Sequence, residues 1–376
     1  MNDLPHQIKR SFYRHPLHLL PCLIMVLLSG CGQEQYPPPQ GTGQISNLNQ
    51  SPSLTGDSTS MEASIQVDYT LRHAAYYTGS CDGSGAVALD HDLFAVVNDE
   101  TSQLLVYARQ APGAPVKTIS LHKALDLKKG EEADLEAMAR IEDRIYVLGS
   151  HSRDREGKKE KERRKLLAVR FKSTTTGPQL TPIGKAYEDL MDDLTDHAAF
   201  DSLHLKEATK KSGDDPKGFN LEGLCAGRNG CLWLCFRGPR VNDKALLIPL
   251  NNPKDVTAGA RARFGDHVLL NLDGRSIRGV DNIEGHIVII ADDDFKGRSP
   301  AIYLWDESQS TPTQLSIPDL NTFDPESIIL YPDTGLQELQ ILSDDGGRRL
   351  LNKDCKDEPN PILKRFRSAT YTWRGN

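Results

Sequence analysis

The sequence lacks the short motifs that identify the commonest enzyme classes. It has no HExxH zinc motif, no glycine-rich nucleotide-binding loop, and no serine, histidine and aspartate in the order of a catalytic triad. The segment GSGAV around Ser84 is only superficially similar to a nucleophile elbow, because it has neither the spacing nor the strand-to-helix setting. No reaction class therefore follows from a motif alone.

The chain also lacks an excess of positive charge. Its 376 residues include 45 Lys and Arg against 52 Asp and Glu, a net charge of −7. Residues 1–30 carry three basic residues and one acidic residue, so without them the charge is −7 − 2 = −9. We therefore expect no nucleic-acid partner. With 38% hydrophobic and 26% charged residues, most of the chain has the composition of a folded soluble protein.

The apolar run near the N-terminus is too short to span a membrane comfortably. Residues 1–30 combine a basic start with this run and then small residues, which predicts an export signal peptide. The ending LLSGC resembles the lipobox of bacterial lipoproteins, which implies that Cys31 is lipidated, with palmitate among the acyl chains, and anchors the protein to a membrane. Gly32 stands where lipoproteins retained in the inner membrane carry an aspartate, and this resemblance favours the outer membrane of the cell envelope over the inner membrane. The alternative is a plain signal peptide with an incidental cysteine.

Residues 31–66 are rich in Gln, Pro, Ser, Thr, Gly and Asn and contain little apolar surface. Such a composition predicts a flexible tether after the lipidated cysteine. Residues 67–376 are then expected to form one folded domain.

From residue 67 onward, short apolar runs alternate with turn residues, which predicts an all-β domain. Four consecutive strand candidates, the content of one propeller blade, occur in each of several sets. The strand candidates of the first set are 85–89, 93–98, 104–109 and 116–121. We predict a β-propeller with five recognisable blades, five or six in total. Residues 67–74 and 365–373 are expected to pair and close the ring, and a small helical insertion is expected around 185–210.

The first strands of the sets superpose without gaps as DGSGAVA, DLEAMAR, NLEGLCA, SIRGVDN and DPESIIL. The third position of this alignment is polar, and the fourth is small, as suits an innermost strand near a crowded axis. We therefore expect the third residues to point into a water-filled central channel. These residues are Ser84, Glu136, Glu222, Arg278 and Glu326.

Loops that enter the first strand and leave the second should lie at one mouth of this channel. They would bring Asp99, Glu100, His151, Arg237 and Asp293 beside the third-position residues. Carboxylates are ligands for Ca²⁺ or Mg²⁺, and guanidinium groups suit anions. The predicted metal set is Asp134, Glu136, Glu222 and Asp293, and the predicted ligand-binding set is Arg237, Arg278, His151 and Asp99. The alternative is a structural network in which Arg278 neutralises neighbouring glutamates.

Five cysteines remain after Cys22 and Cys31, so at least one cannot pair within the chain. A hairpin that turns at Asn229 and Gly230 would place Cys231 and Cys235 on one face and Cys225 on the other. Small buried hydrophobic residues, rather than zinc ligands, are the favoured interpretation of these three.

The blocks VVNDE, DLEAMA, GSHSR, NLEGL, FRGP and IRGV together resemble a bacterial family described as domain of unknown function 3616, over about residues 80–306. The shorter EGL blocks are loosely similar to esterase-like phytase propellers. This second likeness implies metal-assisted phosphoester hydrolysis, with Glu136, Glu222 and Glu326 as catalytic metal-binding or water-positioning groups and Arg237 and Arg278 on phosphate.

Three functions thus follow from the sequence. The favoured one is a lipid-anchored propeller that binds a small anionic or polar ligand, or a protein partner, at its channel mouth. The alternatives are a phosphoesterase dependent on calcium or magnesium and an interaction scaffold without catalysis.

Overall fold

A computed structural model describes residues 69–293 and 297–374. The predicted signal peptide, Cys31 and the tether lie outside these residues. The described chain is built mainly of β-strands, and these form five four-stranded antiparallel sheets and one small hairpin. The first sheet contains β2 (Gly85–Ala88), β3 (Leu93–Val97), β4 (Gln103–Ala108) and β5 (Lys117–Ser120), and the second contains β6 (Leu135–Ile141), β7 (Arg144–Gly149), β8 (Leu166–Thr174) and β9 (Gly177–Tyr187). The third sheet contains β10 (Asn220–Ala226), β11 (Leu232–Gly238), β12 (Ala245–Leu250) and β13 (Val268–Leu270). The fourth contains β14 (Ser276–Ile283), β15 (His286–Asp293), β16 (Arg298–Asp306) and β17 (Thr313–Leu315).

The fifth sheet joins the two ends of the domain. Its order is β18 (Pro325–Leu330), β19 (Glu338–Ser343), β22 (Arg365–Trp373) and β1 (Tyr69–Thr78). Strand β1 pairs antiparallel with β22 from Tyr69 opposite Trp373 to Thr78 opposite Arg365. The predicted ring closure by terminal strands is confirmed. A disulfide between Cys81 and Cys355, 274 residues apart in sequence, adds a covalent link beside this pairing. The small hairpin β20 (Arg349–Leu350) and β21 (Lys353–Asp354) precedes Cys355.

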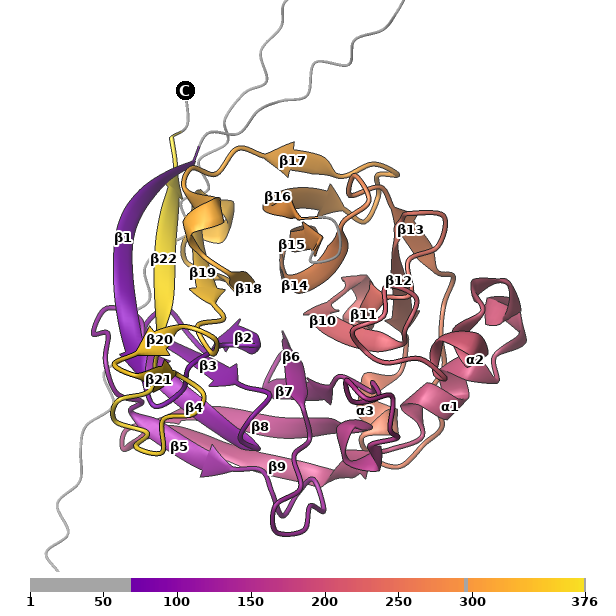
Figure 1. The fold of residues 1–376 in the computed structure, drawn as a ribbon, viewed down its shortest axis with the longest axis horizontal. Helices are drawn as coiled ribbons and strands as arrows, with labels where there is room; N and C mark the ends of the chain where they lie inside the picture. The colour runs from indigo at the N-terminus through magenta and orange to yellow at the C-terminus, as the bar shows by residue number, and fades with distance from the viewer. Residues whose placement is uncertain (1–68, 294–296, 375–376) are drawn as a thin grey trace, which may run out of the picture. The chain divides into compact units, whose positions relative to one another are not determined.

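The five sheets are the blades of a propeller (Figure 1). The first strand of each blade is innermost and contacts the first strand of the next blade, in the order β2, β6, β10, β14 and β18, and β18 contacts β2. The ring therefore closes with five blades and not six. The predicted all-β propeller fold is confirmed.

Apolar side chains pack between neighbouring blades. Each of five buried clusters combines residues of two adjacent blades; for example, Phe94 and Tyr107 of the first blade lie with Tyr77 and Phe366 of the fifth. A blade is covered on both faces, so its central strands read as continuous apolar runs rather than as alternating ones. This explains strands such as LFAVV and HIVIIADD, in which nearly every residue is buried.

The helical insertion lies between the second and third blades (Figure 1). It comprises α1 (Leu190–Thr195), the 3₁₀ helix η2 (Ala198–Leu203) and α2 (Leu205–Ala208). Leu190, Met191 and Leu194 are buried in the cluster shared by these two blades, and the predicted helical insertion around 185–210 is confirmed. A further short helix, α3 (Pro253–Val256), was not expected. No helix among the described residues is both long and apolar enough to cross a membrane.

The prediction that Cys225 faces away from Cys231 and Cys235 is wrong. The hairpin loop is Arg228–Gly230, one residue longer than expected, and Cys225 therefore pairs with Trp233. Since Trp233 lies two residues from both other cysteines, Cys225 shares their face, and it lies in one buried cluster with Cys235. All three thiols are free and buried, which confirms the prediction that they act as small hydrophobic residues.

The inner strands approach each other so closely that the fourth position of the alignment accepts almost no side chain. A Cβ atom added at Gly279 would lie 2.2 Å from the backbone oxygen of Glu326, and one at Gly85 would lie 2.8 Å from the backbone of Ala137. Glycine is required here for close approach and not for its backbone angles.

We expect Gly279→Ala to lower the free energy of unfolding by about 1–3 kcal/mol, because neighbouring backbone cannot move aside easily. Gly347→Ala is the matched control, since a Cβ there meets nothing within 4 Å. Urea denaturation of both variants measures the difference. Equal stability of the two variants would contradict the crowding argument.

Candidate functional site

A β-bulge marks the third position of the alignment in four of the five inner strands. The pairing of the inner strand with its neighbour shifts between Leu135 and Ala137 in β6, and at the equivalent place in β10, β14 and β18. The extra residues are Glu136, Glu222, Arg278 and Glu326. Bulges redirect side chains and are frequent next to active sites. In this fold they direct one ionisable side chain per blade away from the ladder.

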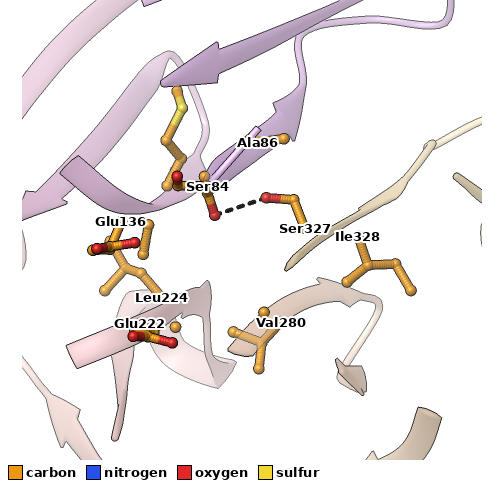
Figure 2. A pocket seen from close by; sticks show the side chains of 13 residues that line it. Ser84, Ala86, Glu136, Glu222, Leu224, Val280, Ser327 and Ile328 are labelled. Carbon is orange, nitrogen blue, oxygen red and sulfur yellow. Dashed lines mark hydrogen bonds between the residues drawn. The ribbon is translucent and has the colours of Figure 1, made fainter. Parts of the chain in front are cut away.

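The channel narrows to a waist that all five inner strands line, with Glu136 and Glu222 among the lining residues. The cavity there measures about 10 Å³, which is room for about one water molecule. Figure 2 shows the waist, with Glu136 and Glu222 on adjacent strands and Ser327 donating a hydrogen bond to the backbone oxygen of Ser84. The channel therefore does not admit an organic molecule at its middle, and a ligand must bind at one of the two ends.

Glu222 is the centre of a network that joins three blades. Its Oε1 atom accepts hydrogen bonds from Arg237 Nη1 at 2.7 Å and from Asn220 Nδ2 at 2.9 Å. Its Oε2 atom accepts from Arg278 Nη1 at 3.0 Å, and Arg278 Nη2 reaches Glu326 Oε1 at 3.2 Å. The residue is 4% exposed. The expectation of a hydrated Glu222 is thus wrong, because two arginines replace water as its partners.

Glu136 has no such partner. It makes no hydrogen bond or ion pair with any residue that the structure describes, although it is partly buried at the waist beside Glu222. Burial raises the pKa of Glu136 well above its usual value, and the carboxylates of Asp134 and Glu222 raise it further. Glu136 therefore faces negative charge without a compensating cation.

Asp99 and Asp82 extend this negative region into the first blade. Burial raises the pKa of Asp99 to about 7, with further increases from the carboxylates of Asp134 and Glu100. Burial also raises the pKa of Asp82 well above its usual value, and Asp99 and Asp344 add to the effect. Ser84 partly offsets this shift by donating a hydrogen bond to Asp82 Oδ1 at 3.1 Å. We call Asp82, Asp99, Asp134, Glu136, Glu326 and Asp344 the acidic rim.

One member of the acidic rim is neutralised by the basic loop between β7 and β8. Asp134 lies 2.8 Å from Arg163 Nη1 and accepts a hydrogen bond from Ser150. Residues 153–165 lie in this loop, and Arg163 folds back from it toward the channel mouth. Lys364 similarly pairs with Glu100 at 2.8 Å.

The predicted metal set is not assembled. Asp134 and Glu222 are bound to arginines. Asp293 lies elsewhere, with Arg298 at 3.6 Å and Arg240 at 3.9 Å as its charged neighbours. Within residues 69–293 and 297–374, no group of three or more His, Cys, Asp and Glu side chains is arranged to hold a metal ion. The four-residue set was wrong because spacing along the strands does not reveal which carboxylates arginines occupy.

Among the predicted ligand-binding residues, His151 is fully buried. It is 0% exposed, and its Nδ1 atom lies 2.8 Å from the backbone oxygen of Gly149. Burial lowers the pKa of His151 to about 4, so the ring is neutral at physiological pH. His151 thus contributes no positive charge to the mouth, whereas Arg237, Arg278 and Asp99 do lie there.

The sequence reasoning missed two contributors to the mouth. Asp344 directly follows β19, as Asn98 and Asp99 follow β3, so the run SDDGG carried a usable signal. No signal in the sequence pointed to Arg163, because nothing in residues 153–165, which contain many basic and acidic residues, distinguishes the one that folds toward the channel.

Residues 84–179 match the family described as protein of unknown function (DUF3616). The chain resembles this family over its first two blades. The match contains the acidic rim residues Asp99, Asp134 and Glu136 and covers about a quarter of the chain, 96 of 376 residues. The resemblance that the sequence blocks indicated is confirmed over this range. A search of the curated proteins finds no match.

Several solved structures are similar to the chain at low sequence identity. Glutaminyl cyclase of Myxococcus xanthus is 11% identical, with a TM-score of 0.44 over 82% of this chain and 97% of that protein. PhoX of Pseudomonas fluorescens, in complex with the transition state analogue vanadate, is 13% identical, with a TM-score of 0.35 over 72% of this chain and 57% of that protein. At such identities and TM-scores they carry no information about the function of this chain.

We expect the acidic rim to make stability depend on pH. The pKa of Asp99, about 7 in the folded protein, exceeds the value of about 4 in an unfolded chain. The folded protein thus holds a proton that the unfolded chain loses, and stability falls as pH rises from about 4 to 7. Asp99→Asn should flatten this fall and raise the melting temperature at pH 8. Thermal unfolding across this range measures it, with Asp357→Asn on the exposed surface as control. Parallel profiles for the two variants would contradict the prediction.

Proposed function

We propose that the protein is a binding propeller whose acidic rim holds the positively charged group of a small organic ligand. The observation that supports this proposal is that several carboxylates at the channel mouth lack an ion pair with any residue that the structure describes, whereas the arginines there each have one. Glu136, Asp82 and Asp99 have no ion-pair partner among the described residues, whereas the cations Arg163, Arg237 and Arg278 are each bound to a carboxylate. Burial, and then the neighbouring carboxylates, raise the pKa of these three groups, and a ligand cation would favour their charged form.

Glu326 supports the same proposal independently of the charge balance. It is 7% exposed, and its Oε1 atom faces Arg278. Its Oε2 atom is buried and has no hydrogen-bond partner. A buried acceptor without a partner costs about 1–3 kcal/mol, so a ligand N–H group that reaches Oε2 would recover this energy. The neighbours of Glu326 include Asp82, Asp99 and Asp344, which place it in the acidic rim.

The charge of the ligand differs from the anion that the sequence favoured. That expectation relied on Arg237 and Arg278 being available to a phosphate or carboxylate. Both are bound to Glu222, and Arg278 also contacts Glu326, so an incoming anion would have to displace these carboxylates. An ammonium or guanidinium group requires no such exchange.

Spermidine is a suitable probe because it carries aliphatic ammonium groups only. We expect spermidine to raise the melting temperature and to bind in isothermal titration calorimetry, and citrate to do neither. Glu136→Gln should weaken spermidine binding at least tenfold, because the substitution keeps the shape and removes the unpaired charge.

Asp357→Asn removes a carboxylate from the surface and serves as the matched control. Spermidine binding that is equal in the Glu136→Gln and Asp357→Asn variants would reflect non-specific attraction to an acidic protein and would refute the proposal. Tighter binding of citrate than of spermidine would restore the anionic ligand.

Metal-dependent phosphoester hydrolysis remains the alternative that the sequence suggested, with Glu136, Glu222 and Glu326 as its catalytic groups. The engagement of Glu222 and Glu326 with arginines weighs against it. Release of phosphate from a panel of phosphoesters, dependent on Ca²⁺ or Mg²⁺ and lost in Glu222→Gln, would establish it. A protein that responds to no amine, anion, metal or phosphoester would instead be a scaffold.

We further propose that the chain is exported and anchored through lipidated Cys31, as the LLSGC segment implies. Cys31→Ser should abolish palmitate incorporation and release the protein from the outer-membrane fraction of a bacterial host. Metabolic labelling with fractionation measures both effects. Cys22→Ser is the control, because that cysteine lies inside the predicted signal peptide. Membrane association that persists in Cys31→Ser without label would contradict the anchor.

A further inference from the structure

A second cavity lies at the other end of the central channel. Its volume is about 270 Å³, and it is lined by the last residues of the inner strands, among them Ala88 of β2, Arg140 of β6, Ala226 of β10, Asp281 of β14 and Leu330 of β18. The acidic rim lies at the beginning of the same strands, and the narrow waist lies between. We call this cavity the distal pocket. It is separate from the site of the proposed function.

Asp281 provides a negative group in the distal pocket. Its Oδ1 atom accepts a hydrogen bond from the backbone N–H of Asn282, and its Oδ2 atom accepts one from that of Leu330, both at 2.8 Å. Each carboxylate oxygen can accept a second hydrogen bond. Asp281 makes no ion pair with the described residues, and burial raises its pKa to about 7. A cationic group within the pocket would therefore stabilise its charged form.

Arg140 provides a positive group across the channel from Asp281. Strands β6 and β14 are not neighbours in the ring, because β10 lies between them. Arg140 Nη1 donates to the backbone oxygens of Ala88 and Leu89, and Nε donates to that of Glu142 at 2.8 Å. These bonds fix the guanidinium group, whereas Nη2 has no partner among the described residues. The Nη2 group of Arg140 is therefore a fixed hydrogen-bond donor, and Arg140 forms no ion pair with a carboxylate of the described residues.

Apolar residues also line the pocket, among them Ile283, which is half-buried, and Val87 and Leu330, which are almost fully buried. The volume lies just below the range of about 300–1,000 Å³ that is typical of pockets for drug-sized molecules. The pocket thus combines the Asp281 carboxylate, the exposed carboxylate of Glu142, the Arg140 guanidinium group and several apolar residues, in a space that suits a molecule of a few heavy atoms.

We propose that the distal pocket binds a small zwitterion with an apolar side chain, that is, a free aliphatic α-amino acid. Asp281 receives the ammonium group, Arg140 Nη2 donates to the carboxylate, and the apolar wall contacts the side chain. Neither charged group needs to leave an ion pair for the ligand to bind, in contrast to the arginines at the acidic rim.

Isothermal titration calorimetry with the whole domain tests this inference. L-Leucine is the probe, and 3-methylbutylamine and 4-methylpentanoate are the matched compounds that lack its carboxylate and its ammonium group. We expect L-leucine to bind at least tenfold more tightly than either compound. Asp281→Asn should weaken L-leucine binding at least tenfold and bring it close to that of 4-methylpentanoate.

Ala226→Leu fills the cavity and leaves both charged groups in place, so it should also abolish L-leucine binding. This variant carries the test if Asp281→Asn fails to fold. Asp357→Asn is the control, and it should bind L-leucine as the unsubstituted protein does. The inference is overturned if L-leucine gives no binding heat at 10 mM, a concentration about tenfold above a millimolar dissociation constant. It is also overturned if either matched compound binds equally well, or if Ala226→Leu retains binding.

Discussion

The closeness of five strands around one axis is the constraint on which the rest of this structure depends. Neighbouring inner strands approach so nearly that a methyl group at Gly279 would meet backbone at 2.2 Å. Little space remains at the waist, and the bulges in β6, β10, β14 and β18 turn one ionisable side chain per strand away from the ladder. The waist thus separates the channel into two chambers with different chemistry, and each must be considered as a binding site by itself.

Among the described residues at the channel mouth that carries the acidic rim, some charged side chains form ion pairs and others do not. The third and fourth blades contribute Arg237 and Arg278, which form ion pairs with Glu222 and Glu326. The first and second blades contribute Asp82, Asp99 and Glu136, whose pKa values rise with burial. A purely structural network would be expected to pair its charges throughout, since unpaired buried charges are costly. This asymmetry is the observation on which the proposed binding of a cation rests.

The repeat in the sequence predicted the fold closely because it reflects a geometric necessity. The small residue at position four and the polar residue at position three follow directly from crowding at the axis. The order of strands in each blade and the closure by β1 and β22 followed from the same reasoning. The bulges were not predictable, because Glu136 and its equivalents read along the chain as ordinary strand residues.

The partners of individual side chains were the part that the sequence could not supply. Arg163 reaches Asp134 from a loop 29 residues away, and no local pattern encodes that contact. A single extra loop residue reversed the face of Cys225, since side chains in a strand alternate with a period of two. The metal set failed for a related reason: four carboxylates near one axis look equivalent until the positions of the arginines are known. Burial and pairing decide the chemistry of a site, and both are properties of tertiary structure.

The way the ring is closed also has a mechanical consequence. Strand β1 is the outermost strand of the fifth blade and is the first described element after the N-terminal segment. A force applied through residues 1–68 is therefore transmitted first to the β1–β22 ladder, and its separation would also withdraw Tyr77 from its contacts with Phe94 and Tyr107 of the first blade. Cys81 follows β1 within three residues and is bonded to Cys355. Separation of β1 would stop at that covalent link, so the disulfide limits how far a pull from the N-terminal side can open the ring.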